Sequence, residues 1–331
     1  MIAHGLLSMP TWRGFSALAL AALVAGCGTR NAQPFAMPAF TATNSLPGTE
    51  RSRFRPFALG HARMEPDAKN KDLLYISAAA TGWVYVYTYP RGRLVGSMDF
   101  VEPEGLCADR SGNISVPDIQ LDEIFEFAHG GSTPIQILQG VPYGAPLDCA
   151  VDPVTGNLAV TNDSNFPGNV AVYLNARGTP RRYTLPRAYP KYCTYNDGGT
   201  LFVDGGDQGR SELAELPRGA NSFEKLSLHQ KTGAMGAVQW DGKYVALGDI
   251  NINVVYRLRI EGLNTKVIGT AKLVGAKHVF QFWIQGRRLI GPDEYASDVG
   301  FWDYPAGGSA TKTIGGVVDP AGSAVSLTAN H

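Results

Sequence analysis

Residues 148–185 contain the pattern that decides the fold of this chain. They form four short segments, Asp148-Cys149-Ala150-Val151-Asp152, Asn157-Leu158-Ala159-Val160-Thr161, Asn169-Val170-Ala171-Val172-Tyr173 and Arg181-Arg182-Tyr183-Thr184-Leu185. Between them lie Pro153-Val154-Thr155-Gly156 and Asn175-Ala176-Arg177-Gly178, where Gly, Pro and Asn tolerate or fix turn dihedrals. Four such segments predict an antiparallel meander of the size of one propeller blade.

The same unit recurs along the chain in a constant register. The polar residues that end each first strand are Asp109, Asp152, Asn196, Asp241, Gln285 and Ser326, at separations of 43, 44, 45, 44 and 41 residues. Propeller blades repeat at about 40 to 50 residues. Because each of the four strand types occurs six times, we predict an all-β, six-bladed β-propeller of four-stranded antiparallel blades.

The order of strands is circularly shifted. The first unit begins with a second strand near Leu73, and the chain ends with an unaccompanied first strand at Gly322–Leu327. The strand missing at one end is the surplus strand at the other. We therefore expect the C-terminal strand to pair in the N-terminal blade and close the ring.

The N-terminal residues predict export and lipid anchoring. Arg13 precedes an apolar run over 15–23 that is too short to span a bilayer but suits a signal peptide. Val24-Ala25-Gly26-Cys27 resembles the bacterial lipobox, which implies a signal peptide over 1–26 and diacylglycerol on the Cys27 thiol. The alternative is an ordinary signal peptide followed by a chance Cys.

Behind Cys27, residues 27–52 are rich in Ala, Pro, Thr, Asn and Ser without sustained periodicity, which predicts a flexible tether. The propeller is expected over 53–331. By resemblance to Gram-negative lipoproteins, in which an Asp after the lipidated Cys marks inner-membrane retention, Gly28 implies transfer to the outer membrane. The expected location is outside the cytoplasm, lipid-anchored to the cell membrane or outer membrane.

The stretch from Pro103 to Asp118 resembles an NHL-type repeat, Pro-x-Gly-Val-x-x-Asp-x-x-Gly-Asn-Val-x-Val-x-Asp. The match is partial at 146–162 and 190–204 and poor at 280–293. The body is similar to bacterial exported NHL or SMP-30-like propellers. This resemblance concerns the fold, because propellers include binding modules, lyases and lactonases alike.

Lactonase-type propellers hold Ca²⁺ at the channel mouth, and Pro103-Glu104-Gly105-Leu106-Cys107-Ala108-Asp109 is similar to one of their motifs. The resemblance makes Glu104 a candidate ligand. Calcium needs several oxygen ligands, but Leu147, Lys191 and Phe280 occupy equivalent positions in other blades. We therefore expect no metal or other cofactor and assign no catalytic residue.

One polar residue per blade follows most second strands and is a candidate for ligand binding. These residues are Asp118, Asp163 (or Asn162 before it), Asp204, Asp249 and Asp293. They could line a binding mouth on one face of the ring. The alternative is structural, because Asp and Asn at turns bond nearby backbone N–H groups.

Lys plus Arg equals Asp plus Glu, at 29 each, so no net charge favours nucleic acid. We expect a binding scaffold for a protein, peptide or glycan, with membrane contact through the lipid anchor only. The alternative is a hydrolase or lyase of the lactonase type at the channel mouth.

Three further cysteines, Cys107, Cys149 and Cys193, fall on first strands, and we expect buried free thiols. Cys149 and Cys193 are equivalent in register and point the same way around the ring. Cys107 is one place further along its strand and points to the opposite face. Only Cys107 and Cys149 could form a bridge, provided that their Cα atoms lie within about 7 Å.

If Cys27 carries the lipid, the substitution Cys27→Ser should move the protein from the membrane pellet to the soluble fraction or leave it unprocessed. Thr29→Ser, two residues further on, is the matched control and should fractionate like the wild type. Unchanged membrane association and normal cleavage of the Cys27→Ser variant would contradict the anchor.

Overall fold

A computed structural model of the chain describes residues 62–141, 144–164, 168–185, 188–207, 210–229 and 232–328. The predicted signal peptide, the tether, Cys27 and the first residues of the predicted body lie outside these ranges. No helix within them is long and apolar enough to cross a bilayer. The helices are single 3₁₀ turns: η1 (Ala68–Asn70), η2 (Ala79–Thr81), η3 (Leu174–Ala176) and η4 (Glu294–Ala296).

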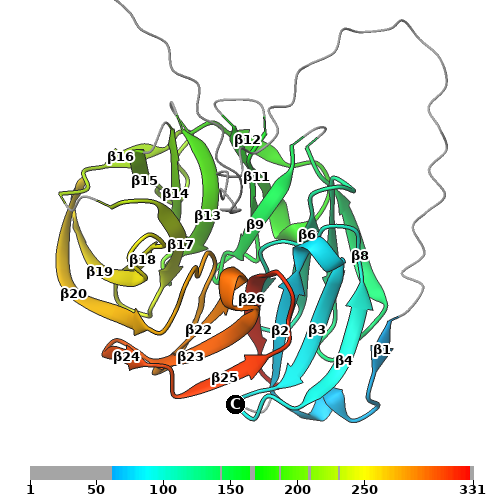
Figure 1. Ribbon diagram of the computed structural model, residues 1–331. Helices are drawn as coiled ribbons and strands as arrows, with labels where there is room; N and C mark the ends of the chain where they lie inside the picture. Colours follow the sequence, from blue (N-terminus) through cyan, green and yellow to red (C-terminus); the bar gives the residue numbers. More distant parts are fainter. Residues whose placement is uncertain are drawn as a thin grey trace, which may run out of the picture. The chain divides into compact units, whose positions relative to one another are not determined.

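Six antiparallel blades follow one another around a central axis, as predicted (Figure 1). Blade 1 contains β2 (Leu73–Ala78), β3 (Trp83–Thr88), β4 (Leu94–Asp99) and β26 (Pro320–Ser326), and blade 2 contains β5 (Cys107–Ala108), β6 (Ile114–Asp118), β7 (Glu123–Phe127) and β8 (Pro134–Gln139). Blade 3 contains β9 (Pro146–Val151), β10 (Leu158–Asn162), β11 (Asn169–Tyr173) and β12 (Arg181–Tyr183).

The second half of the ring repeats this plan. Blade 4 contains β13 (Tyr189–Tyr195), β14 (Leu201–Asp207), β15 (Arg210–Leu216) and β16 (Glu224–Leu226). Blade 5 contains β17 (Met235–Trp240), β18 (Val245–Asp249), β19 (Val254–Glu261) and β20 (Asn264–Val274). Blade 6 contains β21 (Trp283–Gln285), β22 (Arg288–Asp293), β23 (Asp298–Asp303) and β25 (Lys312–Gly315).

In four blades the polar residues used to find the repeat, Asp109, Asp152, Asn196 and Asp241, shape the turn after the first strand. Asp109 Oδ1 accepts hydrogen bonds from the backbone N–H groups of Ser111 and Asn113, both at 2.8 Å. Asn196 Oδ1 accepts one from Gly198 N at 3.0 Å in the same way. These side chains imitate a backbone turn, which explains why Asp or Asn recurs at this position.

The C-terminal strand closes the ring as predicted. In the antiparallel ladder between β2 and β26, Leu73 pairs with Ser326 and Tyr75 with Ala324. Figure 1 shows the red β26 beside the blue β2 at the centre of the ring. Blade 1 is therefore built from both ends of the propeller.

Two short strands were not predicted and widen two blades. β1 (Arg63–Met64) pairs with β4 at the outer edge of blade 1, and β24 (Gly307–Ser309) pairs in parallel with β20 of blade 5. Both cover strand edges whose N–H and C=O groups would otherwise be open. Segments of two or three residues show no periodicity, so the sequence pattern cannot reveal them.

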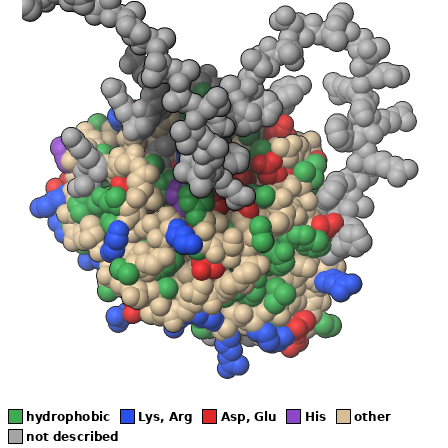
Figure 2. All heavy atoms as spheres, in the orientation of Figure 1, with side chains coloured by type: hydrophobic (Ala, Val, Ile, Leu, Met, Phe, Trp, Pro, Cys, Tyr) green, Lys and Arg blue, Asp and Glu red, His purple; other side chains and the backbone are tan. Residues whose placement is uncertain are grey.

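The core lies between neighbouring blades. Side chains that alternate along the strands fill these interfaces, as with Phe282 at 1% exposure and Trp302 at 2% in the cluster shared by blades 4, 5 and 6. Figure 2 shows Lys and Arg side chains spread around the edge of this view, with Asp and Glu side chains among them.

Deleting residues 316–331 should abolish the cooperative unfolding transition or cause aggregation, because it removes β26 and opens the inner edge of β2. A shorter deletion of residues 329–331 keeps β26 and is the control. Calorimetry and light scattering measure the outcome. A monomeric 316–331 deletion that melts like the full-length protein would contradict closure by β26.

Candidate functional site

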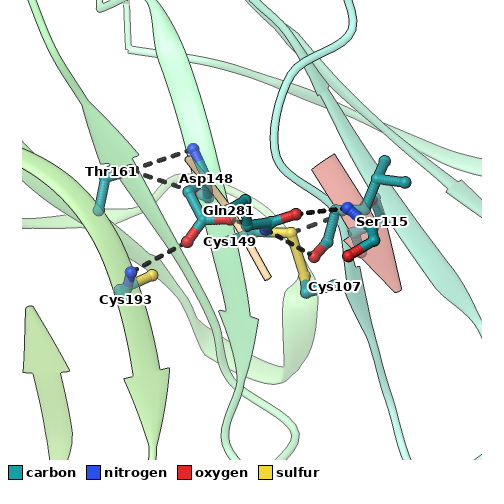
Figure 3. The surroundings of a disulfide bond; sticks show 9 residues. Cys107, Ser115, Asp148, Cys149, Thr161, Cys193 and Gln281 are labelled. Carbon is teal, nitrogen blue, oxygen red and sulfur yellow. Dashed lines mark hydrogen bonds between the residues drawn. A yellow bond between two sulfur atoms is a disulfide. The ribbon is translucent and has the colours of Figure 1, made fainter. Parts of the chain in front are cut away.

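A hydrogen-bonded network of buried polar groups fills the centre of the ring, and Figure 3 shows the part of it around Asp148, Gln281 and Cys193. Gln281 Nε2 donates to Asp148 Oδ1 at 2.6 Å and to the carbonyl oxygen of Leu106 at 3.2 Å. Gln281 Oε1 accepts from Ser323 N at 2.6 Å, and Asp148 Oδ2 accepts from Cys193 N at 3.0 Å. We call these five residues the axial hub, because they come from blades 6, 3, 2, 1 and 4.

The hub requires glycine where backbones approach one another on the axis. A Cβ atom on Gly322 would lie 2.5 Å from the Glu104 carbonyl oxygen and 2.8 Å from Gln281 Oε1. A Cβ atom on Gly105 would lie 2.9 Å from the Leu147 carbonyl oxygen. Any side chain at these positions would force strands of neighbouring blades apart.

A disulfide lies next to the hub and overturns the expectation of three free thiols. Cys107 and Cys149 are bonded across blades 2 and 3, with a Cα–Cα distance of 5.5 Å. Cys193 is a buried free thiol on the neighbouring strand (Figure 3). The strand register predicted from the sequence allowed this pairing as the alternative to free thiols. The bond forms because β5 and β9 lie close together.

On one side of the hub lies a cavity of about 410 Å³, which we call the Glu104 cup. All six blades contribute to its wall, through Ala79, Glu104, Gly105, Leu147, Lys191, Tyr192, Ala234, Ile250, Phe280, Glu294, Asp319, Pro320 and Ala321. Glu104, Leu147, Lys191 and Phe280 are the equivalent first-strand positions identified from the sequence. The cup is therefore the channel mouth, and the hub is its floor.

Glu104 is the most strongly perturbed acid of the cup. Burial, together with the negative charges of Glu102, Asp319 and Glu294, raises the pKa of Glu104 to about 8, and Lys191 opposes this shift. A carboxyl group with this pKa is mostly protonated at neutral pH. Glu294 Oε2 lies within hydrogen-bond distance of His278 Nδ1, at 3.2 Å. Asp319 Oδ2 accepts a hydrogen bond from Ala80 N at 2.9 Å.

The opposite wall comes from a β-bulge in β13. The register of β13 against β14 shifts between Pro190 and Cys193, which places Lys191 and Tyr192 in the cup. Lys191 forms an ion pair with Asp163. Tyr192 N donates to Asp204 Oδ1 at 2.8 Å, and burial raises the pKa of Asp204 well above its usual range.

None of the five predicted ligand-binding carboxylates lines the Glu104 cup. Each instead contacts a segment that lines the cup or lies next to it. Asp118 accepts from Glu102 N, Asp163 pairs with Lys191, Asp204 holds Tyr192, Asp249 accepts from Gly233 N, and Asp293 accepts from Lys277 N and His278 N. These contacts agree with the structural alternative. Direct ligand binding by the five carboxylates stays a prediction.

The sequence alignment of these polar residues holds in three blades, is met in blade 3 by the alternative Asn162 rather than Asp163, and is off by one residue in blade 4. Asp118, Asp249 and Asp293 occupy the same place, opposite Pro103, Met235 and Val279 of their first strands. In blade 3 Asn162 occupies it, opposite Pro146, so Asp163 lies one residue later. In blade 4 Gly205 occupies it, opposite Pro190, so Asp204 lies one residue earlier. The ladders of blades 3, 4 and 5 all contain a bulge before this place, so the offset reflects where the acid falls on the second strand of each blade.

Sequence reasoning did not find Tyr192, Glu294, Asp319, Asp148 or Gln281. Glu294 directly follows the predicted Asp293, and Gln281 is the polar residue between Phe280 and Phe282, so each had a weak local signal. Their convergence depends on which blades face one another across the axis. Within the described residues, no three His, Cys, Asp or Glu side chains are grouped as a metal site would require.

A second cavity of about 580 Å³ lies on the other side of the hub, where the first strands end. Its wall includes the disulfide, Glu126 and the aromatic side chains of Tyr195, Trp240 and Trp283. Asp197 Oδ2 accepts from the Trp240 indole N–H at 3.0 Å. The described residues thus form one cavity on each side of the hub, and we call this one the second cup.

The fold and this geometry define a propeller with a closed axis, and comparison with solved structures agrees on the fold. A chain of the nidogen–laminin complex aligns with a TM-score of 0.66 at 14% identity, over 78% of this chain and 99% of that one. A Bacteroides caccae protein of unknown function aligns at 0.61 and 12% identity, over 77% and 99%. Catalytically inactive virginiamycin B lyase from Staphylococcus aureus with quinupristin aligns at 0.53 and 13%, over 79% and 91%.

No protein-family model matches the chain. Among curated proteins, peptidyl-glycine alpha-amidating monooxygenase A of Xenopus laevis is 37% identical over 153 residues, which is 40% of this chain and 16% of that protein. The B form from the same organism is 29% identical over 153 residues, 40% of this chain and 17% of that protein. The chain thus matches about one sixth of the length of these relatives.

The substitution Gly322→Ala should lower the free energy of unfolding by about 1–3 kcal/mol, because the added methyl group overpacks the hub. Gly315→Ala is the matched control: a Cβ atom there meets nothing within 4 Å, and the change should stay within about 0.5 kcal/mol. Urea unfolding measures both. Equal stability of the two variants would show that the axis is not closed by this contact.

Proposed function

We propose that this protein is an exported, lipid-anchored binding scaffold that holds a protein, peptide or glycan ligand in the Glu104 cup. The observation that carries the proposal is the construction of the cup. Its wall combines charged side chains with apolar ones from all six blades, and its floor is a buried hydrogen-bonded hub. A cavity of about 410 Å³ lies within the range of about 300–1,000 Å³ that ligand sites occupy.

The anchor part of the proposal rests on the apolar run before Cys27 and on the resemblance to a lipobox. A signal peptide and a tether over 27–52 would place the propeller outside the cytoplasm at a membrane surface. The Cys107–Cys149 disulfide supports an oxidising compartment, because structural disulfides persist in exported proteins and are rare in the cytosol.

One observation favours a second candidate function, a hydrolase or lyase at the same mouth. A carboxyl group with a pKa of about 8 is protonated at neutral pH and suits general-acid chemistry, and Glu104 lines the cavity beside Tyr192. Two of the similar proteins, virginiamycin B lyase and the amidating monooxygenases, carry the names of enzymes. Binding ranks first because Leu147, Lys191 and Phe280 stand where further ligands of a lactonase site would be needed.

Photocrosslinking in the source cells tests the proposal. A diazirine side chain of leucine size, introduced at Leu147 in the cup, should give a discrete adduct with the bound ligand after illumination. The same side chain at Ile137, an exposed position on β8 at the outer edge of blade 2, is the control and should give none. Mass spectrometry detects the adducts.

Absence of an adduct from position 147, or the same adduct from both positions, would contradict ligand binding in the cup. If the protein is an enzyme, it releases its product, so no stable adduct forms at position 147. Turnover that is lost in a Glu104 variant would then support the enzyme.

A further inference from the structure

The Glu104 cup carries more negative than positive charge. Glu104, Glu294 and Asp319 line it, and Glu102 is close enough for its charge to raise the pKa of Glu104. Lys191 is the one Lys or Arg side chain in the described wall, and its ammonium group already pairs with Asp163. Among the described residues that line the cup, the acids on the blade 1, 2 and 6 side are therefore not matched by Lys or Arg side chains.

The rest of the wall is apolar. Leu147, Ile250, Phe280 and Pro320 face the cavity between the acids and the bulge of β13. The rings of Phe280 and His278 pack edge to face, with centroids 4.3 Å apart, which holds the Phe280 ring at the cup wall. An apolar wall beside unbalanced carboxylates suits a ligand that carries a cationic group on an apolar stem.

Tyr192 provides a second, independent indication of a ligand. Its side chain is only 8% exposed and lines the cup, and its phenol makes no hydrogen bond with any described residue. Burial raises the pKa of this phenol well above its usual range, and the charges of Glu104 and Asp204 act in the same direction. Buried tyrosine hydroxyls usually have a partner, so a ligand group in the cup would complete the hydrogen bonding.

We propose that the Glu104 cup binds an organic cation, an ammonium or guanidinium group on an apolar stem. The inference rests on the proposed binding function and names its ligand class. The cationic group lies between Glu104, Glu294 and Asp319, with its N–H groups donating to the carboxylates and to the Tyr192 phenol oxygen. The stem packs against Phe280 and Leu147.

Binding of such a cation is coupled to the proton on Glu104. The charged groups that act on Glu104 are Glu102, Asp319 and Glu294, which favour the protonated form, and Lys191, which opposes it. A cation within hydrogen-bond distance lowers the pKa of a carboxyl group by about 1–3 units. Below pH 8 the cation therefore displaces a proton, and well above pH 8 there is no proton to displace.

Calorimetry of the full-length protein in detergent tests this with two probes of nearly identical shape. N-acetyl-arginine amide carries a guanidinium group, whereas N-acetyl-citrulline amide carries a neutral urea. The arginine probe should bind at least about 10-fold more tightly, as expected for charge-assisted hydrogen bonds. Titrations in two buffers of different ionisation enthalpy should show release of about one proton at pH 7 and none at pH 9.5.

Glu104→Gln should abolish the proton release and weaken arginine binding by about 10-fold while leaving citrulline binding unchanged. Glu126→Gln, which removes a half-buried acid from the second cup, is the matched control and should change neither. Glu294→Gln is a second variant, in case Glu104→Gln lowers the melting temperature. It should weaken arginine binding and keep the proton release.

Equal affinity for the two probes, no binding of the arginine probe, or arginine binding at pH 7 without proton release would overturn the inference. So would an arginine affinity that Glu104→Gln leaves unchanged. A crosslinked adduct at position 147 together with any of these results would retain the binding scaffold and reject only the cationic ligand.

Discussion

The hydrogen bond between Gln281 and Asp148 on the axis is the contact on which the rest of the structure depends. A six-bladed ring brings six inner strands toward one line, where polar backbone groups of different blades must find partners away from water. Gln281 uses both the oxygen and the nitrogen of its amide there, and Asp148 uses both carboxylate oxygens. Each bond joins different blades, so the hub ties five of the six blades into one unit.

The hub also explains why the acids of the cup are perturbed. Because the hub fills the centre of the ring, the cup ends in a buried floor. Burial is the largest cause of the raised pKa of Glu104, and it also raises the pKa of Asp148 to about 7. The two groups differ in their partners. Asp148 has its hydrogen-bond donors within the protein, whereas Glu104 faces a cavity with other acids around it. Glu104 is therefore the acid whose charge a ligand can change.

The cup wall is supported from behind by buried carboxylates at the ends of second strands. Asp293 accepts hydrogen bonds from His278 N and from Ala296 N in the turn that carries Glu294, and Asp118 accepts one from Glu102 N, just before Glu104. The repeat thus places a structural acid at the same position in blades 2, 5 and 6, while the side chains that face the cavity differ from blade to blade. The blades repeat regularly but the residues that line the cup do not, so the spacing of Asp residues did not locate the cup.

The sequence alone determined the fold class, the number of blades and the way the ring closes. Repeat spacing and turn residues are local properties, and Asp109 or Asn196 shapes its own turn without help from distant residues. It also restricted the disulfide to Cys107 and Cys149. Only the tertiary structure decided that the bridge forms, that Gln281 meets Asp148, and that Tyr192 enters the cup. These outcomes depend on blades far apart in sequence and on a bulge in β13, since the shift of one residue that a bulge introduces changes which side chain faces the axis.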